Sequence, residues 1–201
     1  MKFYDITREL RSAPLYPGAI QTEVQAVARI QSGMLYNESN LLLSAHAATH
    51  CDAYSHFIEG ALDIAQMPLE HYIGACHVLS FPQNAIVDTP YLIQYMPRGV
   101  RRLLLKGGGN TYLTPAAAQF LIDSSVITLG TDALSVAPPD NEAGVHVPLL
   151  SAGVAIIEQL ELSQVPDGLY TLFAPPLKIA GCEGAPCRAI LIQVPDTPLV
   201  P

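Results

Sequence analysis

Short stretches of apolar residues, alternating or continuous, recur along this chain and are typical of β-strands. Residues 2–7 alternate between polar and apolar side chains and predict a first strand, which a turn at 16–18 follows. Further strands are expected at 20–30, 41–45, 76–81, 85–87, 101–106, 126–129, 154–157, 168–173 and 189–194, with the strand at 41–45 buried. A single helical turn is expected at 67–72.

One stretch gives a clear helix signal. Thr114 is a favourable N-cap residue and Pro115 fits the first helical position, so a helix is expected from there to about residue 122. The apolar run 101–106 precedes this helix and the run 126–129 follows it, an order that predicts a parallel βαβ unit. The glycines at 107–109 lack the lysine and hydroxyl of a P-loop and indicate a tight connection. Residues 131–144 predict an irregular loop, and residues 146–151 a short helix.

Composition narrows the class of protein. Half of the 201 residues are hydrophobic and 14% are charged, which is enough for one well-buried domain spanning 1–201. No run of about 18 apolar residues is present, and the N-terminal residues lack the apolar core of a signal peptide. We therefore expect a cytoplasmic protein without a membrane partner. The four cysteines are then expected to be free thiols: Cys51, Cys76, Cys182 and Cys187.

The charge balance argues against a nucleic-acid partner. The net charge is -8, and no basic cluster exceeds the four residues Arg98, Arg101, Arg102 and Lys106. Few charges among many apolar residues favour a homo-oligomer, because part of the apolar surface would then be covered.

The segment 46–56, HAATHCDAYSH, carries the candidate chemistry and three of the six histidines. His46, His50, Asp52 and His56 are separated by even offsets, so an extended strand would place them on one face. A straight strand would also hold His46 and Asp52 roughly 20 Å apart, whereas ligands of one metal converge to about 2.0–2.2 Å from it. If these residues share an ion, the chain bends between 46 and 52. An ordinary solvated turn is the alternative, but such turns rarely contain three histidines. Imidazole plus carboxylate favours Zn, Mn or Fe(II) over Mg or Ca.

This segment resembles the hallmark His-x-Gly-Thr-His-x-Asp-x-Pro-x-His of the metal-dependent cyclase family, which includes bacterial kynurenine formamidase and isatin hydrolase. Nearly the whole chain shares the resemblance, through YDITREL with YPG, LTPAAAQFLIDSSVITLGTDALSV, VHVPLLSAGVAIIEQL and FAPPLKIAGCEGAPCRAI. The resemblance implies an α/β fold, the swivelling β/β/α domain, in which a mixed sheet and an antiparallel sheet are layered with helices.

The resemblance also implies a ligand set. His46, His50 and Asp52 would bind a first ion, and Asp52 would face a second ion held by His146 and Glu158. Members of the family bind one or two ions, of Zn or Mn. Neutral imidazoles and carboxylates are usual ligands of these metals.

His56 would act as the general acid/base, because an imidazole titrates near neutral pH. The implied activity is hydrolysis of an amide C–N bond in a small molecule, either an aryl formamide such as N-formylkynurenine or a cyclic amide. The implied assembly is a homodimer or tetramer in which a neighbouring subunit closes the pocket. Two alternatives stay open: a non-catalytic metal- or ligand-binding module, and a lyase or dehydratase on the same fold. Retention of His56 favours the enzyme, since metal binding alone would not require it.

The chain departs from the family pattern at four positions. Ala48 replaces the glycine of the hallmark, which predicts backbone strain if that position needs a positive φ. Tyr54 replaces the proline and is expected to change the pocket wall. In GTDALSVAP, Leu134 and Ala137 replace a proline and an acid, which bears on substrate identity.

Overall fold

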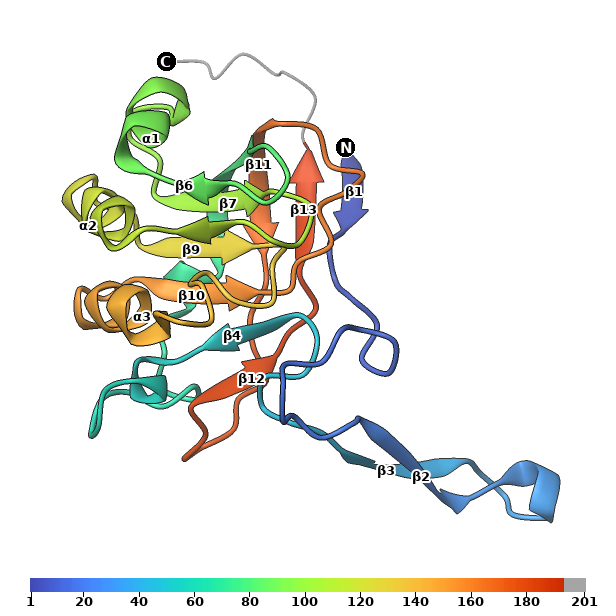
Figure 1. Ribbon diagram of the computed structural model, residues 1–201. Coiled ribbons are helices and arrows are strands. Elements are labelled where there is room, and N and C mark those ends of the chain that lie inside the picture. The colour runs from blue at the N-terminus through green and yellow to red at the C-terminus, as the bar shows by residue number, and fades with distance from the viewer. Residues whose placement is uncertain (194–201) are drawn as a thin grey trace.

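The computed structural model describes residues 1–193 of the chain. Its largest unit is a mixed sheet of nine strands (Figure 1). These strands are β1 (Lys2–Asp5), β4 (His50–Asp52), β5 (Ile73–Ser80), β7 (Arg102–Lys106), β9 (Thr128–Thr131), β10 (Ala155–Glu158), β11 (Gly168–Phe173), β12 (Gly184–Pro186) and β13 (Ile190–Gln193). Their order across the sheet is β1-β13-β11-β5-β7-β9-β10-β4-β12.

The central strands β5, β7, β9 and β10 run parallel to one another. Three helices lie along one side of them in Figure 1: α1 (Thr89–Tyr95), α2 (Pro115–Asp123) and α3 (Glu142–Ser151). The predicted βαβ unit is confirmed as β7-α2-β9, and the Thr114 hydroxyl accepts a hydrogen bond from the Ala117 amide as an N-cap. Helix α1 was not expected from the sequence, although Asp88 caps it in the same way through the amide of Tyr91.

Both faces of the parallel strands are buried, which is why the runs that form them are almost continuously apolar. On β7, Leu103 and Leu105 contact the core beneath the helices, where Leu92 and Leu121 also lie. The intervening Leu104 points to a second core on the opposite face of the sheet. The sheet therefore separates two hydrophobic cores.

Antiparallel strands extend the sheet at both edges. Strands β11, β13 and β1 follow β5 on one edge, and β4 and β12 follow β10 on the other. This arrangement confirms the expected α/β class, with a mixed sheet, antiparallel strands and a helical layer. The end of the strand expected at 189–194 lies outside the described residues. Strand β12 was not expected from the sequence, because three residues give no usable pattern.

Two further strand pairs stand apart from the large sheet. Strand β6 (Ile86–Val87) pairs in parallel with β8 (Tyr112–Leu113) beside the helices. Strands β2 (Glu23–Ala28) and β3 (Glu38–Leu42) form an antiparallel hairpin, the arm, which projects from the body (Figure 1). Short 3₁₀ turns occur at Ile30–Ser32, Tyr54–His56 and Leu69–His71, and the last confirms the turn expected at 67–72.

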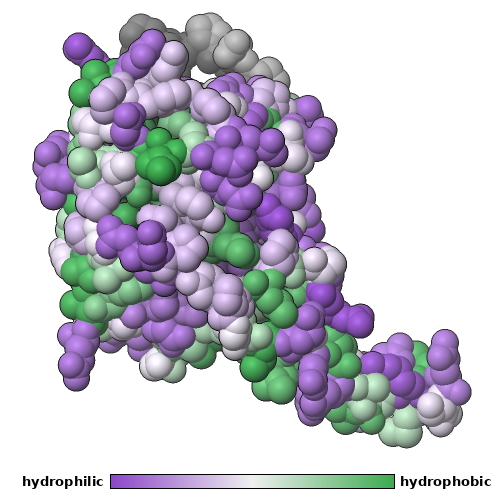
Figure 2. Space-filling model, in the orientation of Figure 1, coloured by the Kyte–Doolittle hydropathy of each residue, from purple (hydrophilic) through white to green (hydrophobic). Residues whose placement is uncertain are grey.

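The prediction of a buried strand at 41–45 is wrong. Strand β3 begins earlier, at Glu38, and all five of its residues are exposed. Its apolar residues belong to the arm, which contacts little of the body, and Figure 2 shows hydrophobic residues gathered where the arm joins the body. Within the described residues, no helix has the length and apolar character needed to cross a bilayer.

Candidate metal and catalytic site

The bend predicted between residues 46 and 52 is present. A turn follows β3 through Ala47, Ala48 and Thr49, and β4 then begins at His50. Ala48 lies in the left-handed region with φ 53°. The condition for strain at this position is therefore met. The turn carries His46 back towards β4, where its Nδ1 lies 3.0 Å from an oxygen of Asp52.

The pairing of β4 with β10 brings the two halves of the site together. His50 lies opposite Glu158 in the antiparallel register, and its Nε2 is 3.5 Å from the Glu158 carboxylate. His146 comes from α3, the helix that leads into β10, and its Nε2 is 3.3 Å from the same carboxylate. The helix predicted at 146–151 begins four residues earlier, so the Nδ1 of His146 bonds to the carbonyl oxygen of Glu142.

Five side chains from these segments form two overlapping groups of potential metal ligands. One group is His46, His50 and Asp52, and the other is Asp52, His146 and Glu158; within each, the ligand atoms lie within 4.8 Å of one another. Asp52 belongs to both groups, as expected for a carboxylate between two ions. The structure therefore brings together all five residues that the sequence nominated.

Unpaired atoms in this cluster fit a bound cation. Both carboxylate oxygens of Asp52 and the Nε2 of His50 are buried, yet none makes a hydrogen bond of good geometry among the described residues, although His46 Nδ1 approaches an Asp52 oxygen to 3.0 Å. Buried polar groups without partners are costly. The Nδ1 of His50 is committed to the carbonyl oxygen of Ala48 at 2.7 Å, which leaves Nε2 facing the cluster, an arrangement common to metal-binding histidines. The donor set of imidazoles and carboxylates suits Zn or Mn.

The side chain of His56 lies beside this cluster. Its ring centroid is 4.3 Å from that of His46 and 6.1 Å from that of His146. His56 belongs to neither ligand group, and burial lowers its pKa, partly opposed by Asp52. The imidazole is therefore neutral at pH 7 and can accept a proton. The neighbouring Phe57 stacks on His146 at 4.6 Å and holds that ring in place.

Opposite charges dominate the electrostatics of the cluster. Burial alone would lower the pKa values of His46 and His146, but the carboxylates around them raise these to about 8 and about 9. Burial would raise the pKa of Asp52 and of Glu158, yet the surrounding histidines hold both below their ordinary values. Without a cation, the carboxylates are thus balanced by protonated histidines.

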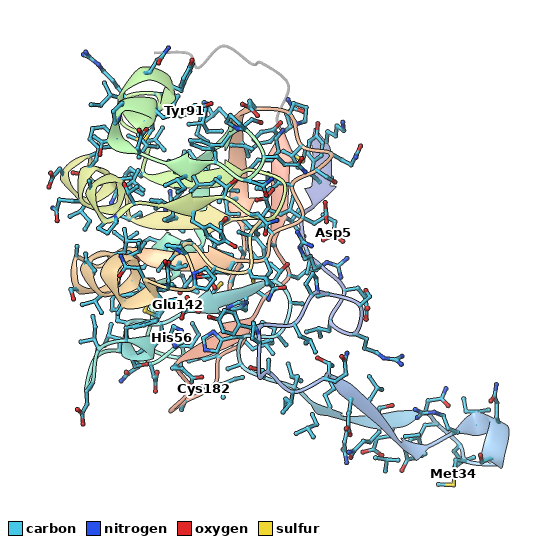
Figure 3. All side chains as sticks on the ribbon, viewed as in Figure 1. Asp5, Met34, His56, Tyr91, Glu142 and Cys182 are labelled. Atoms are coloured by element: carbon cyan, nitrogen blue, oxygen red, sulfur yellow. The ribbon has the colours of Figure 1, made fainter. Side chains whose placement is uncertain are left out.

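The cluster lies at the wall of a cavity of about 240 Å³. Figure 3 shows Glu142 and His56, which both line it, in the lower part of the body close to the arm. Its other lining residues are Tyr16, Ala19, Ser44, His46, His50, Phe57, Leu134, Ser135, His146, Glu158 and Gln159. The hydroxyl of Tyr16 donates to the Glu142 carboxylate at 2.5 Å, and this bond raises the pKa of Tyr16 to about 12.

Sequence reasoning missed several residues of the site. Tyr16 and Glu142 lie on segments that the sequence predicts only as a turn and a loop, and the sequence did not predict a role for Glu183. The Nε2 of His46 lies 3.2 Å from a Glu183 carboxylate oxygen, which orients the ring. Gly184 leaves room for that ring, since a Cβ there would lie 2.9 Å from His46 Cε1. The family-like segment that contains Glu183 was the available signal.

The residues that differ from the family pattern lie in different environments. Leu134 lines the cavity, whereas Ala137 is buried in the core under the helices. Tyr54 does not line the cavity: its hydroxyl lies 3.0 Å from the Gly153 carbonyl oxygen and 2.9 Å from His71 Nε2. Tyr54 therefore ties the site segment to the body rather than reshaping the pocket.

Comparison with known proteins agrees with these features. A family model described as "Putative cyclase" matches residues 4–138. The chain is 32% identical to the kynurenine formamidase of Erythrobacter litoralis over 211 residues, covering 97% of this chain and 95% of that protein. It is 27% identical to the solved structure of a "Potential Metal-Dependent Hydrolase With Cyclase Activity", with a TM-score of 0.83 and coverage of 96% and 99%. Isatin hydrolase A from Labrenzia aggregata bound to benzyl benzoate shares the fold, with a TM-score of 0.80, 21% identity and coverage of 96% and 94%.

Proposed function

This chain belongs to the cyclase family and is a metal-dependent amide hydrolase, and we propose that it cleaves the C–N bond of a small aryl formamide or cyclic amide. The observation that carries the proposal is the pair of ligand groups sharing Asp52, set in the wall of a cavity with His56 beside them. N-formylkynurenine and isatin-like lactams are the substrates to try first.

The ligand roles proposed here are those of the two groups. His46, His50 and Asp52 hold one ion, and His146 and Glu158 hold a second together with Asp52. Zn or Mn is the proposed metal, since the set combines imidazole nitrogen with carboxylate oxygen. When bound, such an ion polarises the scissile carbonyl and lowers the pKa of water next to it.

His56 is the proposed general acid/base. Its neutral imidazole accepts a proton from the water that attacks the carbonyl carbon, and then returns that proton to the leaving nitrogen. The C–N bond breaks as the new C–O bond persists, so the products are an amine and a carboxylic acid. The lowered pKa of His56 keeps it in the accepting form at pH 7.

The cavity suits a small and partly apolar substrate. Its volume of about 240 Å³ lies below the usual range of roughly 300–1,000 Å³ for pockets that bind drug-sized ligands. Phe57 and Leu134 form an apolar part of the cavity wall that an aromatic ring of the substrate can contact. The ligand cluster forms another part of the wall and would contact the amide group.

We further propose a homodimer or tetramer built through the arm. A hairpin of two strands is marginally stable by itself. Here five of the six β2 residues and all of β3 are exposed, and Leu35 near the arm tip is 96% exposed. Packing of the arm on a second copy would cover these side chains. Ala19 and Ser44, at the base of the arm, line the cavity that a neighbour would close.

Residues 1–201 are proposed to act as one domain, because the site draws ligands from both the first and the last thirds of the chain. A cytoplasmic location is proposed because all four cysteines are free thiols, as is usual in a reducing compartment.

The decisive experiment measures metal and turnover together. Purified protein is assayed for Zn and Mn by mass spectrometry, and for hydrolysis of N-formylkynurenine, formanilide and isatin before and after chelation. We expect at least one ion per chain and hydrolysis that chelation abolishes. Turnover in ¹⁸O-labelled water should place one labelled oxygen in the acid product; unlabelled product would indicate a lyase or dehydratase. A metal-loaded protein that hydrolyses none of the substrates would instead be a binding module.

A further inference from the structure

The residue directly after the last ligand of the site has an unusual conformation. Gln159 follows Glu158 at the end of β10, and consecutive residues of a strand point to opposite faces. Both residues nevertheless line the same cavity. The change of direction comes from Gln159 itself, whose φ of 57° lies in the left-handed region that residues with a side chain rarely adopt.

The backbone of Gln159 is fixed on both sides in this conformation. Its amide donates to the carbonyl oxygen of Ala133 at 3.0 Å, and its carbonyl oxygen accepts from the Thr49 hydroxyl at 2.6 Å. Thr49 belongs to the turn that carries His46, so the segments that form the ligand cluster also hold Gln159. Strained backbone held by its surroundings in this way is a frequent feature of functional sites.

The carboxamide of Gln159 has unused hydrogen-bonding capacity. The side chain is only 2% exposed, and its Oε1 is buried without a partner among the described residues. A buried acceptor of this kind is costly unless something pairs with it. The cluster beside it consists of charged or titratable groups, whereas Gln159 is neutral at every pH and offers an acceptor and a donor in one plane.

From this geometry we infer that Gln159 is a specificity-determining residue that recognises the amide group of the substrate: a half-turn of its carboxamide brings Oε1 to the cavity, where it accepts a hydrogen bond from the substrate N–H. The inference rests on the proposed amide hydrolysis. With the carbonyl of the substrate directed at the ligand cluster, the N–H is the polar group of the amide that remains to be paired. The enzyme then prefers a secondary amide to an ester of the same shape, because an ester oxygen cannot donate to Oε1.

The test compares two substrates that differ only at this atom. Metal-loaded wild type and Gln159→Met are assayed with formanilide and with phenyl formate. Methionine has a similar length and no amide. We expect kcat/KM for formanilide to fall about tenfold, as for loss of one neutral hydrogen bond, while kcat/KM for phenyl formate changes less than twofold. An equal loss for both substrates would overturn the inference and leave Gln159 a packing residue.

Two further variants serve as a second test and a control. Gln159→Gly removes the amide and also relaxes the positive φ, so it should fold, keep its metal and lose the same discrimination. Gln119→Met, on the exposed surface of α2, should change neither substrate.

If wild type hydrolyses neither substrate, the proposed function fails, and binding alone decides the role of Gln159. Calorimetry with acetanilide and N-methylacetanilide then provides the readout. Weaker binding of acetanilide alone by Gln159→Met supports recognition of the N–H, and unchanged binding overturns it.

Discussion

Two neighbouring segments of this chain contrast sharply. The arm, spanning β2 and β3, exposes apolar side chains to solvent, whereas the segment 46–56 that follows it buries polar ones. Leu41 on the arm is 60% exposed, and Asp52, only eleven residues later, is fully buried. Figure 3 shows the distance between the two: Met34 lies at the tip of the arm and His56 within the body.

Under the proposals made above, both segments are completed from outside the chain, for opposite reasons. A bound cation would pair with the buried carboxylate and imidazole atoms that lack hydrogen-bond partners, in place of the protons that balance the charge without it. An exposed apolar hairpin needs another protein surface to cover it. Each of the following predictions changes one side of this comparison and leaves the other intact.

The largest effect is expected from the histidines of the buried segment. His50→Ala removes a proposed ligand that faces both carboxylates, so metal and activity should be lost together. His56→Ala should keep the metal while kcat falls roughly 10²–10⁴-fold, the usual contribution of a general acid/base. Metal analysis and steady-state kinetics check both, with His77→Ala on β5 as a control that should change neither. If His56→Ala empties the site as His50→Ala does, His56 is a ligand instead.

The second effect concerns the arm alone. Val24 and Leu41 face one another across the hairpin and are both exposed, so Val24→Asp with Leu41→Asp should prevent association. Light scattering should show a monomer that still binds metal. The matched control is Gln25→Asp with Asn40→Asp, the adjacent polar pair, which adds the same charge and should remain associated. A wild-type protein that is monomeric at micromolar concentration would refute the proposed role of the arm.

A smaller effect should follow pH in the metal-free protein. The pKa values of His46 and His146 are raised to about 8 and about 9, so their protonated forms stabilise the fold. That stabilisation is complete below about pH 6.5, the ordinary histidine pKa, and is lost as pH rises through these raised values. The Tm of chelated protein should therefore fall by about 5 °C over this window. Metal-loaded protein should show no such fall, because the cation replaces the protons.

A Tm of chelated protein that stays constant or rises over the same pH window would contradict the predicted stabilisation by protonated His46 and His146. The variant His146→Gln serves as the control, since it removes the histidine with the larger shift and should flatten part of the profile.

The smallest effect is expected at the turn near the start of the segment 46–56. Ala48→Gly should stabilise the protein by about 0.5–1 kcal/mol, because alanine with a positive φ is strained and glycine is not. Thermal unfolding measures the change, and activity should stay near that of wild type. Ala47→Gly is the matched control and should destabilise, since Ala47 does not have a positive φ. Destabilisation by Ala48→Gly would mean that the buried methyl group outweighs the strain.

Local signals in the sequence were sufficient for parts of the fold. The N-cap at Thr114 with the apolar runs around it predicted the β7-α2-β9 unit, because capping and burial on both faces act over a few residues. The strand at 126–129 was placed two residues early, since Val126 still bonds back to Leu121 at the end of α2. The strand at 41–45 was wrongly predicted to be buried, because an apolar run has the same pattern whether or not its own chain covers it.

The sequence by itself pointed to His46, His50 and Asp52 and required a bend before Asp52 if they share an ion, because these follow from residue type and the reach of the backbone. The ligand roles of His146 and Glu158, and the conditional strain at Ala48, came from the family resemblance. Only the tertiary structure decided that His146 and Glu158, about 100 residues away along the chain, meet the hallmark segment through the pairing of β4 with β10. It also decided that Tyr16, Glu183 and Gln159 border the same site. Such contacts depend on strand order and register, which are set by burial summed over the whole sheet and leave no mark at any one residue.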